Sequence, residues 1–391
     1  MPDRIVVAGA GLAGWRAAEA LRAEGFRGEL VLVGAETHRP YDRPPLSKGL
    51  LTGATPESAL ELTPAEDTQD LDVTWRLGTR VTALKNHTVV LEDGEELDFT
   101  GLVIVTGAAP AVPAGLGRPA GVHVLRTLDD ARALRSELTT SAERVLVLGA
   151  GFIGCELAST CRDLGLPVAV ADPLPHPLVR VLGEDVARRV ERLHRERGVR
   201  WLLGTQVVKF LGRDRVTGAV LSDGRAVRAD VVVIATGVRP ATGWLAGSGI
   251  DTASGVRCDE YLRVLDESGA VVPGVVAAGD VASWTHPLLG APVRVEHWTT
   301  ASLGAATAAR TLVHGPQEKF DAVPSFWSDQ CGLRIQGVGL PGRGEHVELV
   351  HGDLAGEKFV ARYSTGGRHV GSVAFGLPRQ LALERRRLTS A

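Results

Sequence analysis

The most constraining feature of this sequence is a pattern of strand, glycine turn and helix that occurs twice. The first copy, "RIVVAGAGLAGWRAAEAL", spans residues 4–21, and the second, "RVLVLGAGFIGCELAST", spans residues 144–160. Both contain a GxGxxG turn, whose glycines are Gly9, Gly11, Gly14, Gly149, Gly151 and Gly154. Such a turn lets the backbone approach a pyrophosphate at a helix N-terminus, where unpaired N–H groups favour an anion. The pattern therefore predicts α/β dinucleotide-binding folds.

A second pair of segments indicates that a larger unit is repeated. Residues 89–107 and 219–237 lie 130 residues apart and share an Asp-Gly hairpin, an apolar strand and a terminal Thr-Gly. Two glycine turns in this context are more specific than one, and they predict two nucleotide sites. The alternative is a duplicated scaffold that binds a single nucleotide.

The segment "GVVAAGDVA", residues 274–282, is predicted to be a strand that is buried on both faces and rejoins the first sheet. Asp280 lies at its end. A carboxylate at the carboxyl end of a parallel strand can accept a hydrogen bond from a polyol hydroxyl of a ligand. The alternative is a turn aspartate that caps the next segment.

Two Pro/Gly-rich stretches, residues 108–121 and 237–244, mark candidate domain crossings. Beyond residue 314 the pattern changes to alternating strands and a short basic helix candidate at 378–388. We expect a discontinuous first domain, a second domain within it and a small α+β C-terminal domain, with bounds 1–112 plus 242–314, 113–241 and 315–391.

Acidic residues that follow the glycine turns suggest which nucleotide each site takes. Asp172 lies 18 residues after Gly154, near the spacing expected for a carboxylate that binds ribose hydroxyls and repels a 2′-phosphate. The second site is therefore predicted to prefer NADH over NADPH. Glu36 lies 22 residues after Gly14 and is the corresponding ribose candidate at the first site. Because the second site suits NADH, the first site is predicted to hold a tightly bound redox group of dinucleotide form, and FAD matches that description.

Composition and charge exclude several other classes. With 43 basic and 46 acidic residues, the chain has no overall field that would gather nucleic acid. Its apolar runs are far shorter than the roughly 18 to 20 residues of a membrane span, so no span is expected. The sequence that starts with residues 1–4 does not have the pattern of a secretion signal. The four cysteines have neither CxxC nor metal-ligand spacing, which disfavours disulfide and metal chemistry and fits a reducing cytoplasm.

The chain closely resembles the oxygenase-coupled NADH-dependent ferredoxin reductases. The resemblance covers about residues 4–376 and rests on "RPYDRPPLSKGLL", "HVLRTLDDA", "GAGFIGCELA", "GVVAAGDVA", "VEHWTTA" and "PSFWSDQ", in that order. It implies a glutathione-reductase-like α/β architecture with FAD, NAD and C-terminal domains. Ala109 and His176 stand where family members often carry arginine, and Asp172 replaces the commoner glutamate.

The resemblance also implies roles for individual residues. The residues implied to contact the flavin are Arg43, Pro44, Lys48, Arg126, Asp280, Trp298 and Trp327. Ile153 and Glu156 are implied to face the nicotinamide, with Glu156 pairing with Lys48 as the catalytic pair. Simpler alternatives exist, because Lys48 could be a solvated lysine, Glu156 could only complement the helix dipole, and the tryptophans could be core residues.

The activity implied is hydride transfer from NADH to FAD, followed by single-electron transfer to a small, acidic iron–sulfur ferredoxin that feeds a cytochrome P450 or a Rieske oxygenase. Basic segments 188–200 and 384–388 are candidate docking faces. No cysteine precedes Cys155, which argues against a thiol peroxidase or NADH oxidase. The alternatives are a rubredoxin reductase and a redox-signalling flavoprotein resembling apoptosis-inducing factor.

Overall fold

The computed structural model describes residues 3–62, 71–286 and 290–389, and the chain divides into two units. Unit 1 comprises residues 1–42, 60–109 and 239–324, and unit 2 comprises residues 43–59, 110–238 and 325–391. The short segment 43–59 therefore belongs to unit 2, although unit 1 residues flank it on both sides in the sequence.

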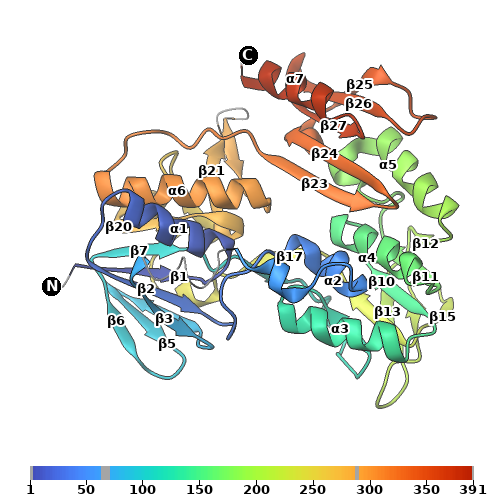
Figure 1. Cartoon of the computed structure of the whole chain (residues 1–391), viewed down its shortest axis with the longest axis horizontal. Coiled ribbons are helices and arrows are strands. Elements are labelled where there is room, and N and C mark those ends of the chain that lie inside the picture. Colours follow the sequence, from blue (N-terminus) through green and yellow to red (C-terminus); the bar gives the residue numbers. More distant parts are fainter. Residues whose placement is uncertain (1–2, 63–70, 287–289, 390–391) are drawn as a thin grey trace. The chain divides into compact units, whose positions relative to one another are not determined.

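Unit 1 is built on a mixed sheet that carries the first glycine turn (Figure 1). The strand order is β22-β21-β18-β19-β20-β7-β1-β2-β3, and the run from β20 to β3 is parallel. Helices α1 and α6 pack against each other beside this sheet. The elements are β1 (Arg4–Ala8), α1 (Leu12–Ala23), β2 (Glu29–Gly34), β3 (Val73–Leu77), β7 (Gly101–Ile104), β18 (Val256–Cys258), β19 (Arg263–Leu265), β20 (Val271–Ala277), η5 (Gly279–Val281), β21 (Ala282–His286), β22 (Ala291–Val293) and α6 (Trp298–His314).

A small antiparallel meander also belongs to unit 1. Its strands are β4 (Val81–Lys85), β5 (Thr88–Leu91) and β6 (Glu96–Asp98), which include the Asp-Gly hairpin predicted at 89–107. Three short elements include residues of both units: η2 (Glu57–Leu60), β8 (Ala108–Pro110) and β17 (Val238–Pro240). The turn η4 (Gly243–Leu245) belongs to unit 1.

The prediction that residues 274–282 rejoin the first sheet is confirmed. Strand β20 pairs in parallel with β7, which in turn pairs with β1. The prediction of a strand buried on both faces holds only for the end of β20, since Val275, Val276 and Ala277 are buried and the preceding residues are not. The strand stops at Ala277, and Asp280 lies in the 3₁₀ turn η5.

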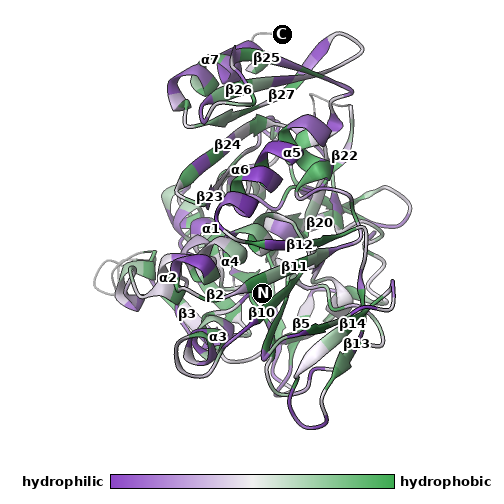
Figure 2. Ribbon diagram, turned by 90° about the vertical axis from the view of Figure 1, so that its right-hand side faces the viewer, coloured by the Kyte–Doolittle hydropathy of each residue, from purple (hydrophilic) through white to green (hydrophobic). Residues whose placement is uncertain are grey.

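Unit 2 contains the second parallel sheet, with strand order β12-β11-β10-β16-β9. All residues of β10 and β16 are buried, as expected for parallel strands covered on both faces, and β10 and β11 appear strongly hydrophobic in Figure 2. The elements are η1 (Pro44–Ser47), α2 (Gly49–Thr52), β9 (Val122–Val124), α3 (Leu128–Thr140), β10 (Val145–Leu148), α4 (Phe152–Asp163), β11 (Val168–Asp172), α5 (Val179–Glu196), β12 (Arg200–Leu203), β13 (Val207–Leu211), β14 (Gly218–Leu221), β15 (Ala226–Arg228) and β16 (Val231–Ile234).

The C-terminal part of unit 2 is an antiparallel sheet with strand order β23-β24-β27-β26-β25, next to helix α7. Its elements are β23 (Ser325–Gln330), β24 (Leu333–Gly339), η6 (Pro341–Arg343), β25 (His346–Gly352), β26 (Phe359–Thr365), β27 (Arg368–Phe375) and α7 (Pro378–Thr389). The predicted α+β character and the helix expected at 378–388 are both present.

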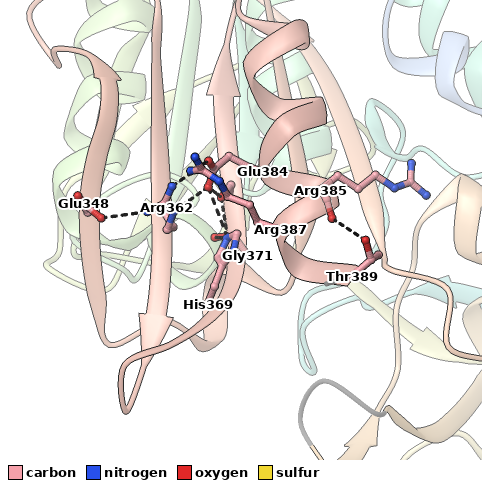
Figure 3. Close-up of polar contacts among 9 residues, drawn as sticks. Glu348, Arg362, His369, Gly371, Glu384, Arg385, Arg387 and Thr389 are labelled. Atoms are coloured by element: carbon pink, nitrogen blue, oxygen red, sulfur yellow. Dashed lines mark hydrogen bonds and ion pairs between the residues drawn. The ribbon is translucent and has the colours of Figure 1, made fainter. Parts of the chain in front are cut away.

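A buried carboxylate fastens α7 to this sheet (Figure 3). The Glu384 side chain is 1% exposed, and it accepts hydrogen bonds from Arg362 Nε at 2.7 Å and Nη2 at 2.9 Å. Arg387 Nη1 donates to the same carboxylate at 2.7 Å. Burial is the largest influence and by itself would raise the Glu384 pKa, but the hydrogen bond and charge of Arg362, together with Arg387 and His369, bring it below its ordinary value of 4.5.

Glu384→Gln is expected to lower the free energy of unfolding of unit 2 by about 3 kcal/mol at pH 7, because it leaves Arg362 without its charged partner. A lowered carboxyl pKa contributes stability that is complete above about pH 4.5 and is lost as the pH falls through the folded-state value. Urea unfolding of the unsubstituted protein and of Glu384→Gln at pH 7 and pH 3.5 measures the difference in their free energies of unfolding, which should be smaller at pH 3.5.

Glu348→Gln is the matched control, because Glu348 lies 3.4 Å from the same arginine but its side chain is 69% exposed. We expect it to change stability by less than about 1 kcal/mol. A pH-independent difference for Glu384→Gln, or equal effects of the two substitutions, would contradict this account of Glu384.

Candidate functional site

The glycine turn of unit 1 needs glycine for backbone packing. A methyl group at Gly14 would lie 1.8 Å from the carbonyl oxygen of Gly9, so no larger residue lets α1 approach the strand. Gly9 has φ +128°, and a methyl group there would lie 2.2 Å from the carbonyl oxygen of Val105. Helix α1 begins after Gly11 with no side-chain cap, so its first N–H groups are available to an anion.

Glu36 and Asp280 lie just after parallel strands of the unit 1 sheet. Glu36 follows β2 and accepts a hydrogen bond from the Tyr41 hydroxyl at 2.5 Å, which fixes the direction of the carboxylate. The Asp280 carbonyl accepts from Arg294 at 3.0 Å. Since β2, β1, β7 and β20 are parallel, both acidic residues lie at the same sheet edge as the glycine turn.

Trp298, the first residue of α6, donates from its indole Nε1 to Asp42 at 2.7 Å. Its neighbour His297 is partly buried, and this burial lowers the His297 pKa to about 4, although Asp280 acts in the opposite direction. The imidazole is therefore neutral at pH 7. Six of the predicted FAD residues belong to unit 1: Gly9, Gly11, Gly14, Glu36, Asp280 and Trp298.

The glycine turn of unit 2 repeats the first with one informative difference. A methyl group at Gly154 would lie 1.9 Å from the Gly149 carbonyl oxygen, whereas one at Gly151 would have no atom of the described residues within 4 Å beyond its chain neighbours and its own helix backbone. Gly151 precedes α4, which has no side-chain cap, and Ile153 in the first turn is 38% exposed. The open space over Gly151 fits a phosphate group at the helix N-terminus.

Asp172 is held against this turn by backbone hydrogen bonds. Its Oδ2 accepts from the Ala150 N–H at 2.7 Å, and its Oδ1 accepts from the Leu174 N–H at 2.8 Å. Strand β11 ends at Asp172 beside β10, so the carboxylate and the turn share one edge of the parallel sheet. This is the position at which such folds bind the ribose of a dinucleotide.

The expected pairing of Lys48 with Glu156 is present. Glu156 is 5% exposed, and its Oε2 lies 2.8 Å from Lys48 Nζ and accepts from the Ser47 hydroxyl at 2.5 Å. The hydroxyl of Thr160, one turn further along α4, donates to the Ser47 carbonyl at 2.8 Å. Segment 43–59 is thus fastened to α4, and Lys48 is a partly buried cation with a fixed partner.

Sequence reasoning missed the second group that holds Glu156. The Ser328 hydroxyl donates to Glu156 Oε1 at 2.5 Å, and Gln330 Nε2 donates to the Ser328 hydroxyl at 2.9 Å. Both residues lie on β23, where Phe326, Ser328 and Gln330 alternate with less buried residues. That alternation was the available signal, although polar residues in such a pattern are normally assigned to the exposed face.

The remaining predicted flavin residues also belong to unit 2. Arg43 Nη1 donates to the Arg126 carbonyl at 2.5 Å, immediately before Pro44 begins the turn η1. The backbone at Arg126 is fixed because Asp130 and Thr127 form a capping box at the start of α3. Trp327 is less buried than its neighbours Phe326 and Ser328 and alternates with them along β23, so it lies on the other face of the strand.

The cysteines lie in surroundings that suppress thiolate chemistry. All four are free and buried. Burial, with a smaller contribution from Glu156, raises the pKa of Cys155, and burial raises that of Cys161 to about 12. These thiols are therefore poor nucleophiles at neutral pH.

In segment 188–200, one of the two candidate docking faces, several arginines already bind other groups within unit 2. Arg189 is buried and donates to the Gly356 carbonyl at 3.3 Å, and Arg188 and Arg195 pair with glutamates one turn away on α5.

Among helices in residues 3–62, 71–286 and 290–389, none combines the length and the apolar composition that a membrane crossing needs.

Comparison of the chain with models of known protein families identifies the family to which it belongs. Residues 3–305 match the family model "Pyridine nucleotide-disulphide oxidoreductase", and residues 325–391 match "Reductase C-terminal". The chain belongs to the pyridine nucleotide-disulphide oxidoreductase family, and it is an oxidoreductase with the fold class predicted from the sequence. Family membership gives FAD and NAD(H) as its cofactors, and both glycine turns fit a dinucleotide.

Similarity to individual proteins narrows the comparison to reductases of oxygenase systems. The chain is 38% identical over 392 residues to the ferredoxin–NAD(+) reductase component of the anthranilate 1,2-dioxygenase system of Burkholderia cepacia, covering 98% of this chain and 93% of that protein. It is 34% identical to putidaredoxin reductase of Pseudomonas putida, covering 94% and 87%. The structure of the covalent putidaredoxin reductase–putidaredoxin complex superposes with a TM-score of 0.93 at 31% identity, covering 99% and 93%.

Proposed function

We propose that this protein is an NADH-dependent ferredoxin reductase that supplies electrons to a cytochrome P450 or a Rieske oxygenase. The main support is its likeness, over nearly the whole chain, to reductase components of dioxygenase systems and to putidaredoxin reductase. A rubredoxin reductase is not favoured over this function by the same relatives. The absence of an accessible thiol is consistent with electrons that leave directly for an external acceptor.

FAD, when bound, would supply the redox chemistry, namely acceptance of a hydride and release of single electrons. The residues of this chain bind and orient. Gly9, Gly11 and Gly14 are assigned to the FAD pyrophosphate, with Glu36 and Asp280 at its ribose and ribityl hydroxyls. Gly149, Gly151 and Gly154 are assigned to the NADH pyrophosphate.

Lys48 and Glu156 are assigned to the reacting ends of the two dinucleotides. Three donors on the Glu156 carboxylate stabilise its negative charge and fix its direction. The carboxylate in turn fixes the Lys48 ammonium group, and a fixed cation stabilises negative charge that develops during hydride transfer. Arg43, Pro44, Arg126, Ile153, Trp298 and Trp327 keep the contact roles inferred from the family resemblance.

Asp172→Asn is expected to weaken discrimination against NADPH by about tenfold, because a neutral amide no longer repels a 2′-phosphate. The ratio of kcat/KM for NADH to that for NADPH measures the effect. Asp223→Asn, in an exposed hairpin of the same unit, is the control and should leave the ratio unchanged. An unchanged ratio in Asp172→Asn would remove Asp172 from the ribose site.

The partner proposed is a small, acidic iron–sulfur ferredoxin. Steady-state turnover with NADH and such a ferredoxin tests this, with a rubredoxin as the comparison acceptor. We expect many turnovers with the ferredoxin and a KM that rises with salt, since charge complementarity between exposed groups is screened. Preference for the rubredoxin would favour the alternative acceptor.

The cytoplasm is the proposed location, because the four buried cysteines form no disulfide and the nicotinamide substrate is intracellular. Fractionation of cells that express the protein tests this. Recovery in the periplasmic or membrane fraction would contradict it.

A further inference from the structure

A chain of buried hydrogen bonds extends from Glu156 to helix α5. Ser328 Oγ lies 2.5 Å from Glu156 Oε1, Gln330 Nε2 lies 2.9 Å from Ser328 Oγ, and His194 Nε2 lies 3.0 Å from Gln330 Oε1. All four side chains are buried, and Ser328 and His194 have no exposed surface. The chain therefore links α4, β23 and α5 through polar groups that water does not reach.

The direction of each hydrogen bond follows from the acceptor at the end. The Glu156 carboxylate accepts only, so Ser328 donates its hydroxyl proton to it. The Gln330 amide then donates to Ser328 Oγ, which leaves its carbonyl oxygen facing His194. The imidazole must donate from Nε2 and is the Nε2–H tautomer. Every donor in the chain therefore points toward Glu156.

His194 is suited to a fixed donor role. Burial lowers its pKa to about 4, although the hydrogen bond with Gln330 opposes this, so the ring is neutral at pH 7. The ring packs edge-on against Trp201, with centroids 5.5 Å apart. Its Nδ1 has no hydrogen-bond partner among the residues the structure describes. Three aligned donors polarise one another, which strengthens the bond to the carboxylate.

We propose that Ser328, Gln330 and His194 are positioning residues that align the Glu156 carboxylate with Lys48 and so set the rate of hydride transfer. This role rests on the proposed function, because it requires the Lys48–Glu156 pair to act at the reacting cofactors. The residues act through Glu156 and contact no substrate.

The first test is the tautomer of His194 in the holoenzyme, measured by NMR with ¹⁵N-labelled histidine. The His194 signal is assigned by its loss in His194→Gln. We expect a neutral Nε2–H ring at pH 7, and a changed Nε2 shift in Ser328→Ala and in Glu156→Gln, since the first removes a hydroxyl from the chain and the second removes the charge of the terminal acceptor. An Nδ1–H ring, or a shift that neither substitution changes, would overturn the proposal. This readout does not depend on ferredoxin reduction.

The second test compares matched substitutions in anaerobic flavin reduction by NADH. Ser328→Ala should slow the limiting rate about tenfold and leave the Kd for NADH unchanged. His194→Leu, which removes the remote donor, should slow it less, and His194→Gln, which keeps an N–H donor, should restore the rate toward that of the unsubstituted protein.

Equal rates in His194→Leu and His194→Gln would indicate a purely structural role and overturn the proposal, as would an unchanged rate in Ser328→Ala. Thermal melting of each variant identifies losses caused by unfolding. Failure of the unsubstituted protein to reduce any ferredoxin would refute the proposed function instead, because flavin reduction and the NMR signal are measured without ferredoxin.

Discussion

Gly154→Val is expected to abolish NADH oxidation because unit 2 does not fold around the larger side chain. Even a methyl group at this position would lie 1.9 Å from the Gly149 carbonyl oxygen, and neither backbone can move away without separating α4 from β10. Circular dichroism and limited proteolysis measure the loss of structure. A variant that melts at the temperature of the unsubstituted protein would contradict this.

Gly151→Ala provides the matched comparison in the same turn. Gly151 has φ −77°, and within the described part of the chain a methyl group there would have open space around it, so we expect unchanged stability. The same methyl group would occupy the space assigned to the NADH pyrophosphate, and the Kd for NADH should rise by about tenfold or more. Unchanged NADH binding would refute the assignment of this turn to the nucleotide.

Lys48→Met is expected to slow flavin reduction by NADH about 100-fold, the size of effect seen when one fixed electrostatic contact to a transition state is removed. The substitution also leaves the buried Glu156 carboxylate without its cation. Lys48→Arg retains the charge but changes its geometry, so its rate of flavin reduction should lie between those of Lys48→Met and the unsubstituted protein. Anaerobic stopped-flow absorbance of the flavin gives the rates directly.

The control for Lys48 is Lys209→Met, on the exposed edge of β13 in the same unit, which should leave the rate unchanged. A rate in Lys48→Met within twofold of that in the control would show that Lys48 has no part in hydride transfer. Lys48 would then be the solvated lysine that remained an alternative from the sequence.

The parallel sheets and their glycine turns could be predicted because their signals are local. Short β-branched strands lead into turns that only glycine can form, because an added methyl group at Gly14 or Gly154 would lie 1.8 Å or 1.9 Å from a carbonyl oxygen. The position of Asp172 at the end of β11 was predictable for the same reason, since its spacing from the turn follows from the length of one helix and one strand. Its contact with the ribose remains a prediction. The bounds of β20 were less predictable because its first residues are exposed.

Features that depend on distant contacts could not be predicted from local patterns. The pairing of Lys48 with Glu156, more than 100 residues away, was expected only from the family resemblance. The hydrogen bond from Ser47 to the same carboxylate was not predicted. Ser328 and Gln330 were missed because a polar residue in an alternating strand is normally exposed. Their burial is explained only by the hydrogen bonds they make to each other, to Glu156 and to His194.

The most direct test of the central claim is an anaerobic titration in which the purified flavoprotein is mixed with NADH and then with excess oxidised [2Fe–2S] ferredoxin. We expect rapid flavin bleaching by NADH, and two ferredoxin clusters reduced for each NADH consumed, over many turnovers. A flavin that bleaches into a long-lived NADH complex and transfers no electrons to the ferredoxin would contradict the account and favour a redox-signalling role.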